Sequence, residues 1–151
     1  MGAPASVRDR TSPAADDSRR RQIFAGLVGL AALAVLLQGL WAGLFLQYSG
    51  PVHRTERHSW LTVHARGGEV ACALALLATV WAILRLRSQL SLVLGATALT
   101  VLLVAVAYVG GLITDDKMDS LIPLHIPLAL GALILAVWLS LQAAGYRRRP
   151  G

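Results

Sequence analysis

The chain has a single cysteine, Cys72, among its 151 residues. One thiol can form neither an intrachain disulfide nor a multi-cysteine metal site, so Cys72 is expected to be a small packing residue. The sequence also lacks a phosphate-binding glycine loop, an HExxH helix and a Ser-His-Asp arrangement. Hydrolytic chemistry is therefore not expected, and nothing in the chain points to an enzyme that turns over a substrate.

Charged residues are scarce as well, at 15% of the chain, and are rare or missing in four long apolar blocks. Each block is near the roughly 20 residues that a helix needs to cross a bilayer. The first block is longer than the apolar core of a signal peptide, so we expect it to stay as an anchor. The predicted fold is an all-α integral membrane four-helix bundle, with helices at residues 23–48, 61–84, 90–113 and 121–145.

The net charge of +6 comes from basic residues that gather on one side of this predicted topology. By the positive-inside rule, both termini of a multi-pass protein of the cell membrane are then cytoplasmic. Topology accounts for the charge, so the expected partner is the lipid bilayer and not nucleic acid. The residues are Arg8, Arg10, Arg19, Arg20, Arg21, Arg85, Arg87, Arg147, Arg148 and Arg149.

Three segments follow from these patterns. Residues 1–21 are rich in Ala, Pro, Ser, Asp and Arg without apolar periodicity, which predicts a disordered cytoplasmic tail. Residues 22–146 form the four-helix transmembrane domain, and residues 147–151 form a basic cytoplasmic tail.

The two halves of the chain resemble each other. With an offset of 66, residues 29–37 (GLAALAVLL) fall on residues 95–103 (GATALTVLL), and with an offset of 61, His64 falls on His125. We therefore predict two tandem helical hairpins related by an axis along the membrane normal, as in parallel-repeat transporters. This symmetry places the two histidines at the same depth, roughly 6 Å inside the outer ends of their helices.

A histidine inside a transmembrane helix is costly unless it faces a cavity or a partner. Two at matched depth could ligate one haem b iron from opposite sides, since helical bundles hold cofactors between facing helices. Small residues follow both histidines, and of these Gly68 is expected to leave room for the macrocycle. Arg66 is the candidate cationic partner for a haem propionate.

Other readings of the polar residues stay open. His125 could instead hydrogen-bond a carbonyl freed by Pro123 or Pro127, and Glu69 is expected to pair with Arg66 three residues earlier. Gln38 is expected to form a hydrogen bond between helices. A zinc or copper site in the outer loops is a further alternative, built from His53, His58, His64, Asp115, Asp116 and Asp119.

Residues 22–146 resemble a family of small four-helix bacterial membrane proteins that is known as a domain of unknown function. The resemblance rests on Gln38 with Ala42 and Gly43, on a histidine followed by glycine, and on Leu124-His125 at the start of the fourth helix. It implies the same topology and draws attention to the two histidines. The layout is also distantly similar to four-helix b-type cytochromes.

Two functions are compatible with these features. The first is electron transfer or redox sensing through one haem b bound by His64 and His125, which would need a redox partner in the membrane. The second is a structural or accessory role without a cofactor, with Gly/Ala faces packed against a second copy or a larger complex.

Overall fold

The computed structural model describes residues 13–48, 50–115 and 117–145, and four long helices account for most of them. They are α1 (Pro13–Gln47), α2 (Arg54–Arg85), α3 (Leu90–Asp115) and α4 (Ile122–Ala143), with short 3₁₀ helices η1 (Pro51–His53) and η2 (Asp119–Leu121) before α2 and α4. All four long helices are apolar and long enough to cross a membrane. The predicted all-α bundle of four membrane-spanning helices is confirmed.

Helix α1 begins earlier than the sequence predicted. Residues 13–21 were expected to be part of a disordered tail, but they form the first turns of α1. Arg20 forms an ion pair with Asp16 one turn earlier, which supports the exposed start of the helix. The prediction for residues 13–21 was therefore wrong, while residues 1–12 and the basic tail at 147–151 lie outside the described residues.

The polar segment before the second apolar block is also helical. Helix α2 starts at Arg54 and not at residue 61, and the Trp60 ring stacks on Trp41 of α1 at 5.9 Å between ring centres.

Helix α4 starts at Ile122 with Pro123 in its first turn, where the missing N–H costs no hydrogen bond. Pro127 lies inside α4.

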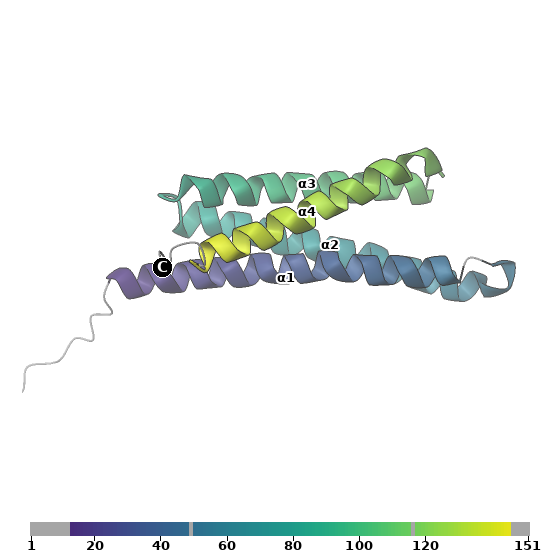
Figure 1. Cartoon of the computed structure of the whole chain (residues 1–151), viewed down its shortest axis with the longest axis horizontal. Helices are drawn as coiled ribbons and strands as arrows, with labels where there is room; N and C mark the ends of the chain where they lie inside the picture. Colours follow the sequence, from purple (N-terminus) through teal and green to yellow (C-terminus); the bar gives the residue numbers. More distant parts are fainter. Residues whose placement is uncertain (1–12, 49, 116, 146–151) are drawn as a thin grey trace, which may run out of the picture.

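The helices form two hairpins, α1 with α2 and α3 with α4, which pack side by side (Figure 1). Helix α1 lies next to α2 and α4, and α3 lies next to the same two helices, so that α1 and α3 are at opposite corners. Helix α4 runs obliquely, from the first half of α1 to the far end of α3. The tandem hairpins that the repeat predicted are present.

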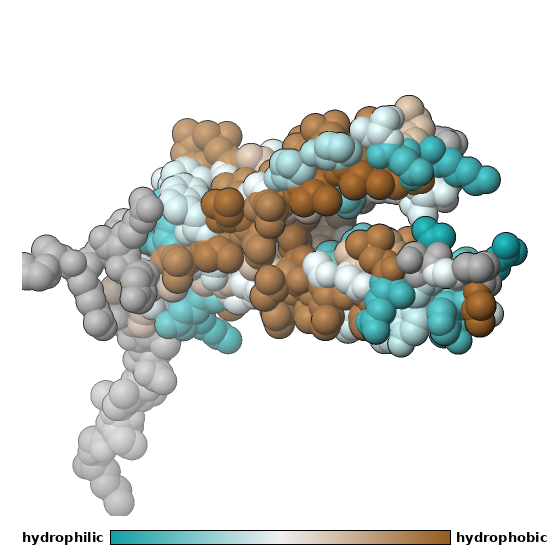
Figure 2. Space-filling model, turned by 45° about the vertical axis from the view of Figure 1, so that its right-hand side comes forward, coloured by the Kyte–Doolittle hydropathy of each residue, from teal (hydrophilic) through white to brown (hydrophobic). Residues whose placement is uncertain are grey.

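The two ends of the bundle differ in packing. We call the end with the α2–α3 turn, the start of α1 and the end of α4 the terminal end, and the opposite end, with η1 and η2, the loop end. Every buried side chain among the described residues lies in the terminal half, within residues 24–35, 71–86, 92–103 and 132–143. At the loop end the hairpins separate, and Figure 2 shows a cleft between them.

Burial supports one half of the predicted repeat and corrects the other. The buried positions of α2 map onto those of α4 with the predicted offset of 61, so Ala71 corresponds to Ala132. In α1 and α3 the buried positions match with an offset of 64, pairing Val28 with Leu92, whereas the predicted offset of 66 would pair Val28 with Leu94, which is 60% exposed. Sequence identity between two Ala/Leu-rich helices does not show which of their positions correspond in space, because that correspondence depends on which side chains are buried.

Candidate functional site

His64 and His125 lie next to each other and form the centre of the candidate site. Their ring centres are 6.5 Å apart and the ring planes are tilted by 53°. His64 comes from α2 and His125 from α4, which stand at opposite corners of the bundle and belong to different hairpins. Each is seven residues, about two turns, from the first buried alanine of its helix, Ala71 or Ala132. The predicted pairing at equal depth is confirmed.

Gln38 of α1 fixes His64 from one side. The Nδ1 atom of His64 lies 3.2 Å from the backbone carbonyl oxygen of Gln38, to which it donates when Nδ1 carries the proton. In the amide orientation that satisfies its neighbours, the Gln38 nitrogen lies 2.6 Å from the carbonyl oxygen of His64 and 3.1 Å from Nδ1 of the same residue, and the amide oxygen accepts from the N–H of Gly68 at 3.3 Å. In this orientation the amide bridges two consecutive turns of α2, which is the kind of interhelical hydrogen bond that the sequence predicts for Gln38.

Two glycines allow this approach. A Cβ on Gly67 would collide with the Gln38 amide, whereas a Cβ on Gly68 would meet nothing within 4 Å. Gly68 contributes its backbone N–H and not merely free space. Its neighbour Gly67 is the position where the lack of a side chain is required.

His125 packs on α3 in a similar way. A Cβ on Gly110 would lie 3.1 Å from Cε1 of the His125 ring, so the imidazole rests on the helix backbone. The backbone carbonyl of Val106, one turn earlier, also lies beside the ring. Nδ1 of His125 is buried and makes no hydrogen bond to the described residues.

Aromatic side chains border the site on the α1 side. The Phe45 ring meets His64 edge-on at 5.6 Å between ring centres. Trp41 and Trp60, which stack on each other, lie one turn before Phe45 in α1 and one turn before His64 in α2. Sequence reasoning missed Phe45 and Gly110. Phe45 follows Gln38 by seven residues, which places both on one face of α1, and this spacing was the available signal.

Arg66 does not join the histidines. Its guanidinium binds Glu69 at 2.8 Å, and the two side chains are 74% and 63% exposed. Two residues along a helix turn the side chain by about 200°, so Arg66 points away from the face of His64. The predicted Arg66–Glu69 pair is confirmed, and Arg66 is not placed to contact a ligand that lies between the two histidines.

The remaining polar candidates do not gather into a metal site. Among the described residues, no three of the His, Cys, Asp and Glu side chains lie close enough together to hold an ion. Asp116 and the side chain of Asp115 lie outside the described part, so this alternative is judged on His53, His58, His64 and Asp119 alone. Cys72 packs against the core, as expected for a small packing residue.

No family model, curated protein or solved structure matches this chain. Metal–imidazole bonds in proteins are roughly 2.0–2.1 Å long, so two opposed nitrogens on one metal are about 4 Å apart, and the ring centres, each about 1.1 Å further back, are ~6.3 Å apart. The observed 6.5 Å agrees with this separation.

Proposed function

We propose that this protein is a multi-pass protein of the cell membrane, with both termini cytoplasmic, that holds one haem b between His64 and His125 for electron transfer or redox sensing. The observation that carries the proposal is the 6.5 Å between the two ring centres, the spacing that one metal atom between two imidazoles requires. The tilt of 53° between the rings is compatible with this role, because each ring can rotate about its own bond to the metal.

The surroundings of the pair also suit a flat ligand. The histidines belong to different hairpins, so a flat ligand between them would lie between the α1–α2 hairpin and the α3–α4 hairpin. No described residue of the loop half is buried, so the two hairpins share no packed core there. A macrocycle in this position would cover apolar faces of both hairpins and replace the missing core.

One contact of His64 is compatible with ligation through Nε2. When Nδ1 of His64 donates to the Gln38 carbonyl, the lone pair of the ring is on Nε2. Such an N–H···O=C contact orients the ring and fixes its tautomer, as in many metal-binding histidines. Gln38 is thus proposed to position His64, while Gly110 positions His125. The bound haem would supply a one-electron carrier in a water-poor setting.

The proposed orientation rests on the arginines of the terminal end. Arg19, Arg20 and Arg21 are on the first turns of α1, and Arg85 and Arg87 flank the α2–α3 turn. Their concentration at one end of the bundle favours the cytoplasmic side for that end, and therefore an outer-leaflet position for the histidines.

The test is an absorption spectrum of the detergent-purified protein, first oxidised in air and then reduced with dithionite. We expect a Soret band and sharp reduced α and β bands, lost in His64→Ala and in His125→Ala. His58→Ala is the matched control, since His58 is exposed on the same helix as His64 but outside the pair, and its spectrum should be unchanged.

A colourless wild-type protein, even after expression with added haem precursor, would refute the haem proposal. If the two site variants then also lost stability relative to His58→Ala, the pair would have the alternative, structural role. Circular dichroism and size-exclusion profiles show whether each variant is folded before its spectrum is compared.

A further inference from the structure

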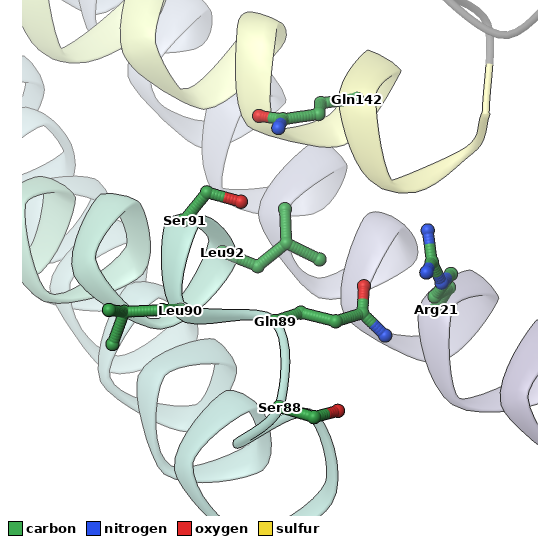
Figure 3. Close-up of a pocket in the computed structure, with 7 residues that line it drawn as sticks. All are labelled: Arg21, Ser88, Gln89, Leu90, Ser91, Leu92 and Gln142. Carbon is green, nitrogen blue, oxygen red and sulfur yellow. The ribbon is translucent and has the colours of Figure 1, made fainter.

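A second site lies at the terminal end, far from the histidines. It is an open pocket of about 390 Å³ where three parts of the chain meet. Arg21 comes from α1, Gln142 from the last turns of α4, and residues 88–92 from the α2–α3 turn and the start of α3 (Figure 3). The buried Leu92, which is 2% exposed, lies between Gln89 and Gln142 and forms an apolar floor.

The lining is cationic and rich in hydrogen-bond donors. It contains no acidic residue, and its one charged side chain is Arg21. Among the described residues, Arg21 has no ion-pair partner, whereas its neighbour Arg20 is paired with Asp16. Arg85 lies over the Trp81 ring. Arg21 is the one guanidinium that lines the pocket, and a guanidinium is well suited to phosphate oxygens.

The backbone contributes to the same charge. Leu90 and Ser91 are the first residues of α3, so their N–H groups have no intrahelical carbonyl to bind. The carbonyl of Gln89 already accepts from the N–H of Leu92 at 2.9 Å. Together with the hydroxyl groups of Ser88 and Ser91, these N–H groups give the pocket a partial positive charge that adds to that of Arg21.

The side chain of Gln142 adds a hydrogen-bond acceptor to the lining of the pocket. Its Oε1 atom is buried and has no hydrogen-bond partner among the described residues. A bare phosphate dianion offers no donor to this oxygen, whereas a headgroup that carries hydroxyl groups does. Next to the polar lining, the Leu90 side chain is 63% exposed and continues the lipid-facing apolar surface of α3.

We propose that this pocket binds one anionic phospholipid with a hydroxylated headgroup, such as phosphatidylglycerol. Arg21, the serine hydroxyls and the first N–H groups of α3 hold the phosphate, a headgroup hydroxyl donates to Gln142, and the acyl chains follow Leu90. The bound lipid joins α1, the α2–α3 turn and α4 at the end of the bundle where the core is packed. This site is independent of the haem proposal.

The test is native mass spectrometry of the full chain released from nanodiscs of equal parts phosphatidylglycerol and phosphatidylcholine. We expect one phosphatidylglycerol to be retained. Because a hydrogen bond to a charged group contributes more than a neutral one, Arg21→Gln should lower its retention roughly tenfold. Gln142→Leu, which removes the amide at nearly constant size, should shift selectivity from phosphatidylglycerol toward phosphatidylcholine. Arg87→Gln is the matched control, since it removes the same charge from the same end outside the pocket.

Two results would overturn the proposal. If Arg87→Gln weakened retention as much as Arg21→Gln, the lipid would be held by general surface charge. If millimolar glycerol 3-phosphate displaced the lipid completely from the wild type, the site would serve a soluble phosphate compound. Should Arg21→Gln fail to fold, Ser91→Ala tests the same phosphate contacts.

Discussion

Gly67 and Gly68 allow a test of the contact between Gln38 and α2, because only one of these two adjacent glycines lies against the Gln38 side chain. A Cβ on Gly67 would collide with the Gln38 amide, while a Cβ on Gly68 would meet nothing within 4 Å. Gly67→Ala should therefore displace the amide and break its bonds to the His64 carbonyl and the Gly68 N–H. Gly68→Ala leaves both bonds in place, since alanine keeps the backbone N–H.

The expected free energies follow from two terms. Alanine in place of glycine inside a helix stabilises it by about 0.8–1.0 kcal/mol, and this gain applies to both variants. Polar contacts between transmembrane helices contribute about 0.6 kcal/mol on average and about 1.7 kcal/mol at most, and only Gly67→Ala loses them. Gly68→Ala should thus be more stable than the wild type by up to about 1 kcal/mol, and Gly67→Ala should be less stable than Gly68→Ala by about 1 kcal/mol.

The assay is equilibrium unfolding in mixed detergent micelles with increasing fractions of dodecyl sulfate, followed by circular dichroism. Both substitutions are then repeated in a Gln38→Ala background. If the amide is the cause, the difference between the two positions disappears there, which is the coupling that a double-mutant cycle measures. Equal stability of the two variants in the wild-type background, or a difference that persists without Gln38, would refute the proposed contact.

The other predictions concern the contacts of α4. Leu139→Ala should destabilise the bundle by about 2–5 kcal/mol, because Leu139 is fully buried against Gly95, whereas Leu141→Ala on the exposed face should cost much less in the same unfolding assay. Gly110→Ala places a Cβ 3.1 Å from Cε1 of His125 and should move the ring by a few tenths of an ångström, while Gly111→Ala meets nothing within 4 Å. The Hε1 resonance of His125 in a histidine-labelled sample should shift in the first variant and not in the second. An unchanged resonance in both would show that the ring does not rest on α3.

Much of the architecture could be predicted from the amino-acid sequence. The four apolar blocks identified the helices because a bilayer requires a minimum length of apolar chain whatever the packing. The offset of 61 brought His64 and His125 to one depth, since two crossings per hairpin return the chain to the same side. The pairing of Arg66 with Glu69 followed from their spacing along one helix.

Several features were missed, some within one helix and some between helices. The tail was predicted from composition, which does not register the Asp16–Arg20 pair that supports the first turns of α1. Arg66 was assigned to the ligand site from its depth alone, although its angular position, about 200° from His64, already placed it on another face. Gly67 and Gly110 are unremarkable in the sequence, and their role depends on which side chains approach them.

The sequence by itself determined the number of helices, their order and the common depth of the two histidines, because hydropathy and chain length act locally. Only the tertiary structure decided the register of α1 against α3, the bridge from Gln38 to α2 and the 6.5 Å between the imidazoles. The bridge depends on how closely α1 and α2 pack within one hairpin, and the distance between the imidazoles depends on how far the two hairpins separate once their small residues have packed at the terminal end. In a membrane, apolar residues are equally well solvated by lipid and by protein, so shape, and not hydropathy, selects the arrangement.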